Sequence, residues 1–288
     1  MNFVLAAIFV CLSYGIADNI HAYLLKRTSA LKLGFWVSVF EFLIGIPLLI
    51  FIFSDEIHKL SLSNLAWLTG TALLVAVGWL AFLMGLKKGS IILTGTISGA
   101  YPVVSIFIGL VFFNETINGG QMLAIALTLI GVILSSAGGQ LSKMLKNIQG
   151  SVLLYAFTAF ILFGVSLAVV KVPVENVGWL MPLLFIDLVC AIVYYLFAKS
   201  VKEPNFLSLP KSSGLVFISA AILVASSLMY YYAITKGPIA IVVPITGSGV
   251  AVFVLLAHYF FKEKLTSLQK SGIALTLIGV ISLSFLSA

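Results

Sequence analysis

The sequence predicts an all-α integral membrane protein in which ten transmembrane helices form two five-helix repeats of inverted topology around a central cavity. Three observations support this prediction. Hydrophobic residues make up 61% of the chain and charged residues 9%, whereas about a quarter of a soluble domain is charged. The apolar segments run on for about 20 residues, the length that crosses a bilayer as a helix. Finally, the motif ALTLIGVI occurs twice, at Ala126–Ile133 and at Ala274–Ile281.

Continuous apolar runs define the expected spans. Because lipid offers no hydrogen-bond partner to the backbone, a run of this kind is expected to form a helix. The expected spans cover residues 3–24, 33–53, 65–86, 90–111, 119–138, 151–170, 177–198, 213–234, 238–260 and 268–287. The two longest loops contain Asp55–Lys59 and Lys202–Asn205, so no connection is long enough for a soluble domain.

The internal repeat extends well beyond the repeated motif. Trp79–Ser136 aligns without a gap on Ser227–Ser284, and with small gaps Glu41 aligns on Asp187. We therefore expect a first repeat at residues 1–138, a polar linker at 139–150 and a second repeat at 151–288. Five spans per repeat is an odd number, so the second repeat must enter the membrane from the opposite side.

The distribution of basic residues predicts the orientation of the chain. The loops after the odd-numbered spans hold most of the 16 Lys and Arg residues: Lys26, Arg27, Lys32, Lys87, Lys88, Lys143, Lys146, Lys199, Lys202, Lys211, Lys262, Lys264 and Lys270. The opposite side carries Lys59, Lys171 and Lys236. The positive-inside rule places the first group in the cytoplasm, and both termini are then outside.

Composition and motifs argue against several classes of function. The net charge of +7 is scattered between apolar runs, with no patch that could follow a nucleic-acid backbone, and contact with anionic lipid explains it better. The chain has no P-loop, no zinc-protease motif and no nucleophile elbow. Cys11 and Cys190 lie in apolar runs as expected free thiols, and with three histidines a metal site is not expected. We expect neither an enzyme nor a cofactor.

Three acidic residues inside apolar spans are the sharpest functional signal: Asp18, Glu41 and Asp187. A charged side chain at the centre of a spanning helix costs about 2.5–3.5 kcal/mol to insert, so each acid needs a compensating role. The functional interpretation is a carboxylate that carries a proton or binds a cation. The alternative is a neutral acid that is hydrogen-bonded to a neighbouring helix.

Polar neighbours share the helix faces of two of these acids. Ser38 lies on one stripe with Glu41, and small or polar residues on a face indicate that it does not point at lipid. Tyr14 and His21 lie one turn on either side of Asp18, where both could form hydrogen bonds with it.

Aromatic residues and helix breakers complete the candidate site. Aromatic rings within the spans could form walls around a ligand: Tyr14, Trp36, Trp79, Tyr101 and the run Tyr230-Tyr231-Tyr232. An ammonium group above such a ring gains about 0.5–2 kcal/mol. The alternative is helix packing or anchoring at the membrane interface. The expected hinges or helix breaks are Gly99, Pro102, Pro244 and Gly247. A proline inside a span kinks the helix and frees a carbonyl group, although static packing is the alternative.

Two series of residues occur in the same order in both halves. The series are Lys88-Gly-Ser-Ile, Pro102, Asn114-Glu115-Thr116, Gln121 and Gly131, and then Lys236-Gly-Pro-Ile, Pro244, Lys262-Glu263-Lys264, Gln269, Gly272 and Gly279. This order resembles the drug/metabolite transporter superfamily, specifically its ten-span EamA-type branch with two tandem five-span domains. The resemblance implies a secondary transporter without ATP, in which spans 1–4 and 6–9 line the cavity and spans 5 and 10 lie at the periphery. Family members usually have cytoplasmic termini, whereas the charges here predict the reverse.

These observations together predict a proton- or ion-coupled transporter of a small polar or amine-bearing metabolite or drug. It would work by alternating access in the cell membrane, taken to be a prokaryotic inner membrane, and export is favoured because it is common among relatives. The alternatives are a translocase of a lipid-linked headgroup, an importer of a small cation and a scaffold without transport. The buried acids argue against a scaffold. A monomer suffices for one cavity, and an oligomer stays possible. Glu115 and Glu263 are expected to be helix-start caps or hinge residues.

Overall fold

The computed structural model describes residues 2–88, 91–137, 150–262 and 265–287, and all regular elements in these ranges are helices. The first half contains α1 (Phe3–Leu25), α2 (Ala30–Phe51), the 3₁₀ helix η1 (Ser54–Lys59), α3 (Leu62–Lys88), α4 (Ile91–Gly99), α5 (Pro102–Phe112) and α6 (Gly119–Ala137). The second half contains α8 (Gly150–Val169), α9 (Lys171–Asn176), α10 (Leu180–Ser200), α11 (Ser213–Lys236), α12 (Ile239–Gly247), α13 (Gly249–Phe261) and α14 (Ser267–Leu286). The all-α prediction is confirmed for this part of the chain.

Nine helical segments in the described ranges are long and apolar enough to cross a membrane. One of them, Ile239–Phe260, is made by α12 and α13 together. The expected span at 90–111 is instead divided between α4 and α5, and its apolar helical part is the shorter segment Ile97–Phe112. The division follows from the sequence, because Gly99 ends α4 and Pro102, which needs no amide hydrogen, begins α5.

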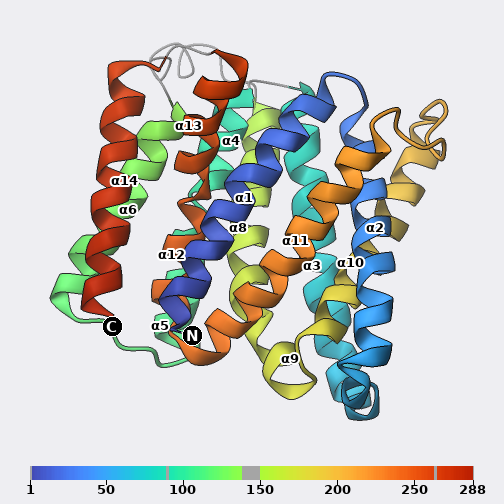
Figure 1. The fold of residues 1–288 in the computed structure, drawn as a ribbon, viewed down its shortest axis with the longest axis horizontal. Coiled ribbons are helices and arrows are strands. Elements are labelled where there is room, and N and C mark those ends of the chain that lie inside the picture. The colour runs from blue at the N-terminus through green and yellow to red at the C-terminus, as the bar shows by residue number, and fades with distance from the viewer. Residues whose placement is uncertain (1, 89–90, 138–149, 263–264, 288) are drawn as a thin grey trace.

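The two halves pass through the bundle in opposite directions. In Figure 1, α1 rises from the face that carries both termini, whereas α8 starts at the opposite face and descends to α9. Helices from different halves are also the main partners of one another: α1 packs on α11 and α13, α2 on α10, α3 on α8, and α6 on α14. The halves therefore interleave and do not form two separate bundles.

The repeated motif packs against its own copy. A Cβ atom added to Gly131 of α6 would lie 2.4 Å from the backbone nitrogen of Thr276, and one added to Gly279 of α14 would lie 2.3 Å from Oγ1 of Thr128. Thr128 and Thr276 occupy the same position in the two copies. Small residues are needed here because helices in lipid associate by close packing and not by hydrophobic exclusion. As Figure 1 shows, this pair lies at one edge of the molecule.

The most enclosed element is α12, in which every residue is buried. Its side chains join a large cluster that includes Val10 of α1, Tyr231 of α11 and Leu283 of α14. Lipid therefore does not reach this helix. The central cavity that the sequence led us to expect stays a prediction.

Candidate functional site

The structure brings Glu41 of α2 and Asp187 of α10 together inside the bundle. Asp187 is buried and Glu41 is partly buried, and the two carboxyl groups lie close enough to interact with each other. The two positions also align in the internal repeat. The contact joins α2 of the first half to α10 of the second half, so the acidic pair lies between the two halves.

The chemistry of the acidic pair requires a proton or a cation. An ionised carboxylate only accepts hydrogen bonds, so two of them cannot satisfy each other. No described residue donates a hydrogen bond to Oδ2 of Asp187, which is buried. In the described ranges, the ion pair that the structure contains is formed elsewhere, by Lys171 and Glu115. The pair can therefore hold one proton between its oxygens, or a cation in place of the proton.

Three tyrosines interact electrostatically with the acidic pair, and one of them, Tyr194, lies on the same helix as Asp187. Electrostatic interactions connect Tyr14 of α1 with Glu41, and Tyr231 of α11 with both acids. The sequence had indicated Tyr230, but its hydroxyl donates a hydrogen bond to the carbonyl of Leu167 at 2.6 Å and fixes the last turn of α8. Tyr231, a member of the same predicted run, is the one that interacts with both acids, and Tyr194 of α10 is the residue that the prediction left out. Consecutive helical residues differ by 100° in direction, so only one member of the tyrosine run can face the pair squarely.

The third predicted acid lies apart from the pair, on the same helix as Tyr14. Asp18 is exposed, and electrostatic interactions connect it with both Tyr14 and Tyr101. These contacts place it toward the break between α4 and α5. His21, the other predicted neighbour of Asp18, has a buried Nε2 atom without a hydrogen-bond partner among the described residues.

The two helix breaks meet each other next to Tyr101. This tyrosine precedes α5, and its hydroxyl is a hydrogen-bonding neighbour of Thr246 in α12. A Cβ atom added to Gly247 would lie 2.8 Å from Cγ of Pro102 and 3.2 Å from the Tyr101 hydroxyl. The sequence predicted both breaks but not their contact. Whether Gly99, Pro102, Pro244 and Gly247 act as hinges stays a prediction.

The remaining predicted aromatic residues lie in two separate parts of the structure. Trp79 of α3 and Tyr101 both contact Phe163 of α8, with ring centroids 5.4 and 6.4 Å apart, so Phe163 joins two candidate wall residues. Phe163 is also the repeat counterpart of Tyr14. Trp36 packs on Phe40 of its own helix, at 5.8 Å between ring centroids, and its Nε1 atom is buried without a described partner. Ser38, one turn from Glu41, is buried.

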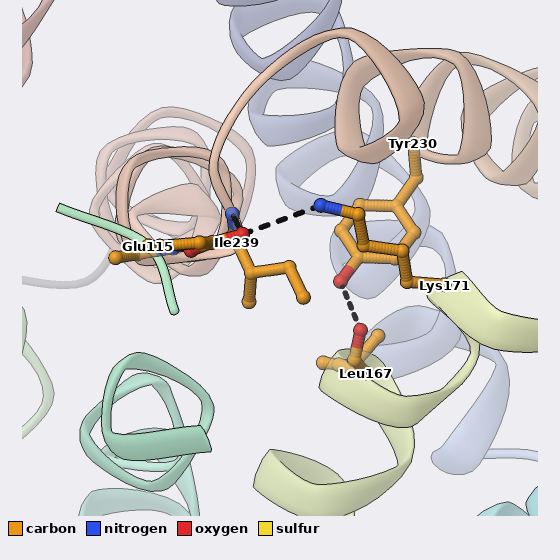
Figure 2. A network of polar contacts seen from close by, with 6 residues as sticks. Glu115, Leu167, Lys171, Tyr230 and Ile239 are labelled. Atoms are coloured by element: carbon orange, nitrogen blue, oxygen red, sulfur yellow. Dashed lines mark hydrogen bonds and ion pairs between the residues drawn. The ribbon is translucent and has the colours of Figure 1, made fainter. Parts of the chain in front are cut away.

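A second polar network connects the two halves at the face that carries the termini. Figure 2 shows Glu115, which follows α5, at the start of α12. Its carboxylate accepts hydrogen bonds from the backbone nitrogens of Ile239 at 2.8 Å and Ala240 at 2.9 Å, and Lys171 Nζ lies 3.3 Å away. The expectation of a helix-start cap is confirmed, although the capped helix belongs to the other half. Glu263, its repeat counterpart, lies outside the described residues.

Glu56 caps a helix in the same way and was missed by the sequence analysis. It lies in η1, and its carboxylate accepts hydrogen bonds from the backbone nitrogens of Trp179, Leu180 and Met181 at 2.7, 2.9 and 2.7 Å. These groups begin α10. Only 5% of Glu56 is exposed. A loop position gives no sequence signal for this role, because the capped helix is distant in the chain.

Comparisons with known proteins agree with this arrangement. The model of the EamA-like transporter family matches residues 1–137 and again residues 150–285. An uncharacterized protein of Methanocaldococcus jannaschii is 49% identical over 67 residues, which are 23% of this chain and 49% of that protein, so the chain spans about half the length of this curated relative. A solved structure described only as the crystal structure of a protein has a TM-score of 0.79 at 13% identity, covering 99% of this chain and 97% of the other. That likeness shows a shared fold.

Proposed function

Since the chain belongs to the EamA-like transporter family, and is thus a membrane transporter of small molecules, we propose that protons or another cation drive its transport. Its substrate is a small polar or amine-bearing metabolite or drug, and the favoured direction is export. The transporter works by alternating access between its two inverted halves. The observation that carries this proposal is the contact between Glu41 and Asp187, for which the described residues supply no basic partner.

A proton and the substrate compete for the acidic pair, and this competition couples the proton flux to the substrate flux. With one proton between the carboxyls, the pair has a single negative charge, and both acids are held in a hydrogen bond. Loss of that proton leaves two negative charges in a medium of low dielectric constant, where a cationic group is strongly attracted. An amine that enters the site therefore replaces the proton. Tyr14 supplies a ring and a hydroxyl group at the same place, and an ammonium group gains from contact with such a ring.

Transport in proteoliposomes tests this proposal. Glu41→Gln cannot release a proton at this site, so we expect flux driven by a pH gradient to be lost. Asp187→Asn should have the same effect, and the double variant should be no worse than either single variant, because both changes disable one shared proton site. The matched control is Glu175→Gln on α9, which makes the same chemical change at an exposed position. Unchanged flux with unchanged pH dependence in Glu41→Gln would rule out the assignment.

One observation favours the second candidate, translocation of a lipid-linked headgroup. An open hollow of about 580 Å³ at the end of α10 is lined by Lys199 and Lys202 next to Leu207. Leu207 is exposed. Basic side chains next to apolar surface suit an anionic headgroup with an attached chain. Thermal-shift measurements with the purified protein separate the candidates: stabilisation by amines supports the first, and stabilisation by anionic lipid alone supports the second.

A further inference from the structure

Two glutamates occupy corresponding loops in the two halves. Glu56 lies in η1, which follows α2, and Glu203 lies in the loop that follows α10. The two helices are the second long helices of their halves and pack on each other. The two loops lie at opposite faces of the bundle, because the halves are inverted (Figure 1). Each glutamate contacts the start of the other half's second helix.

The contact of Glu56 is direct and buried. Its two carboxylate oxygens accept the three backbone hydrogen bonds that begin α10, with distances of 2.7–2.9 Å. The preceding Gly178 has a φ of +137°, and a Cβ atom added there would lie 2.2 Å from Cδ of Glu56. A glycine is thus required both for the backbone conformation and for the room that the carboxylate occupies. At this face a loop of the first half thus holds the start of a helix of the second half.

The contact of Glu203 is indirect and exposed. Its carboxylate accepts a hydrogen bond from the hydroxyl of Ser29, the residue that caps the start of α2. The same hydroxyl oxygen accepts a hydrogen bond from the backbone nitrogen of Lys32 at 3.2 Å. Glu203 is therefore one side chain away from the backbone groups at the start of α2, whereas its counterpart Glu56 binds those at the start of α10 directly. The contact of Glu56 is largely buried, and the contact of Glu203 is exposed. Such a difference is expected if one face is closed while the other is open.

We propose that Glu56 and Glu203 are positioning residues that close opposite faces of the transporter in alternation. The proposal rests on the proposed alternating-access function. In the described state, Glu56 holds the start of α10 at the face of the termini. In the opposite state, Glu203 binds the first backbone nitrogens of α2 in place of the Ser29 hydroxyl, and Glu56 leaves the start of α10. A carboxylate suits this role because its charge complements the positive end of a helix dipole and water can replace it when the face opens.

Hydrogen exchange measured by mass spectrometry on the full chain in lipid nanodiscs tests the proposal. Two sets of amides are followed: residues 179–181 at the start of α10 and residues 30–33 at the start of α2. In Glu56→Gln, exchange should become about tenfold faster at 179–181, since a hydrogen bond to a charged group is lost. Exchange at 30–33 should become slower, because the population shifts to the state that Glu203 closes. Glu203→Gln should produce the reverse pattern.

The change in exchange at the helix start that the substituted glutamate does not contact distinguishes alternation from static capping. If each substitution speeds exchange only at its own helix start and leaves the other unchanged, the two glutamates are independent caps and the proposal fails. Glu203 is only partly buried and its hydrogen bond to Ser29 lies at the surface, so Glu203→Gln is expected to fold and to report at 179–181 even if Glu56→Gln does not fold. Gly178→Ala, which crowds Glu56 without removing its charge, should copy the pattern of Glu56→Gln. Glu175→Gln is the control and should change neither set.

The exchange measurement needs neither substrate nor pH gradient. Reciprocal exchange together with intact flux in Glu41→Gln would overturn the proposed coupling but keep the alternating contacts. Loss of flux in Glu41→Gln without reciprocal exchange would keep the coupling and overturn the alternation. The two proposals thus fail separately.

Discussion

Glu115 satisfies two of the backbone N–H groups that every helix start leaves unpaired. It does this for α12 from a loop of the opposite half, in a partly buried position. Lys171 balances its charge at 3.3 Å, and the same ammonium group lies 5.4 Å from the ring centroid of Phe113. A Cβ atom on Gly109 would lie 2.6 Å from the carboxylate, so the neighbouring helix also leaves room for it. One side chain therefore connects α5, α9 and α12.

Replacement of this side chain should weaken the fold measurably. In Glu115→Gln one acceptor oxygen becomes a donor that faces backbone N–H groups, and we expect a loss of about 2 kcal/mol. The midpoint of thermal unfolding in detergent should fall by about 5 °C, as followed by fluorescence-detected size-exclusion chromatography. Glu175→Gln should leave the midpoint unchanged. Equal midpoints for Glu115→Gln and the unmodified protein would contradict the capping role.

The sequence could identify the important acids but not all of their partners. The cost of burying Glu41 and Asp187 marks both residues, and the repeat shows that they correspond. Correspondence does not give distance, so their contact needed the structure. Glu56 gave no signal at all, because a glutamate in a polar loop looks the same whether it faces water or a distant helix. The run of three tyrosines at 230–232 was marked as a whole, because its members have the same chemistry and the sequence does not say which one faces the acids. Tyr194 was left out because it lies nearer the end of its span.

At the scale of elements, the pairing of α6 with α14 depends on two small residues. Gly131 and Gly279 each lie against a threonine of the other helix. Gly131→Val and Gly279→Val should each separate the helices and reduce the yield of monodisperse protein in size-exclusion chromatography. Because both act on one interface, their effects should not add. Gly70→Val on α3 is the control, since nothing lies within 4 Å of its added Cβ atom. A normal yield of Gly131→Val would show that this contact is dispensable.

Most elements could be predicted from hydrophobicity alone, because the bilayer imposes one length on every span. The expected spans and the observed helices agree to within a few residues, for example 151–170 against Gly150–Val169. Hydrophobicity does not predict the short elements η1 and α9, because their positions depend on contacts with distant residues and not on apolar length. The contact between the two helix breaks is hidden from the sequence for the same reason.

At the scale of the molecule, both termini lie at one face of the bundle, as Figure 1 shows. The distribution of lysine and arginine predicts that this face is outside. A C-terminal alkaline phosphatase fusion should then be active, and a C-terminal green fluorescent protein fusion should be dark. Fusions that end in the loop after α10, which contains Lys202 and Lys211, should give the opposite result. A fluorescent C-terminal fusion would reverse the predicted orientation.

The contact of α6 with α14 has a consequence for the origin of the chain. Position 128 meets 279 and position 131 meets 276, so the two sides of the contact are the same surface used twice. A surface that is complementary to itself forms a closed, two-fold symmetric pair. A five-helix ancestor with one copy of this surface already possessed everything needed to dimerise, provided that its molecules inserted in both orientations. Duplication and fusion of its gene would then have preserved an existing assembly, and it would have freed Glu41 and Asp187 to become different residues.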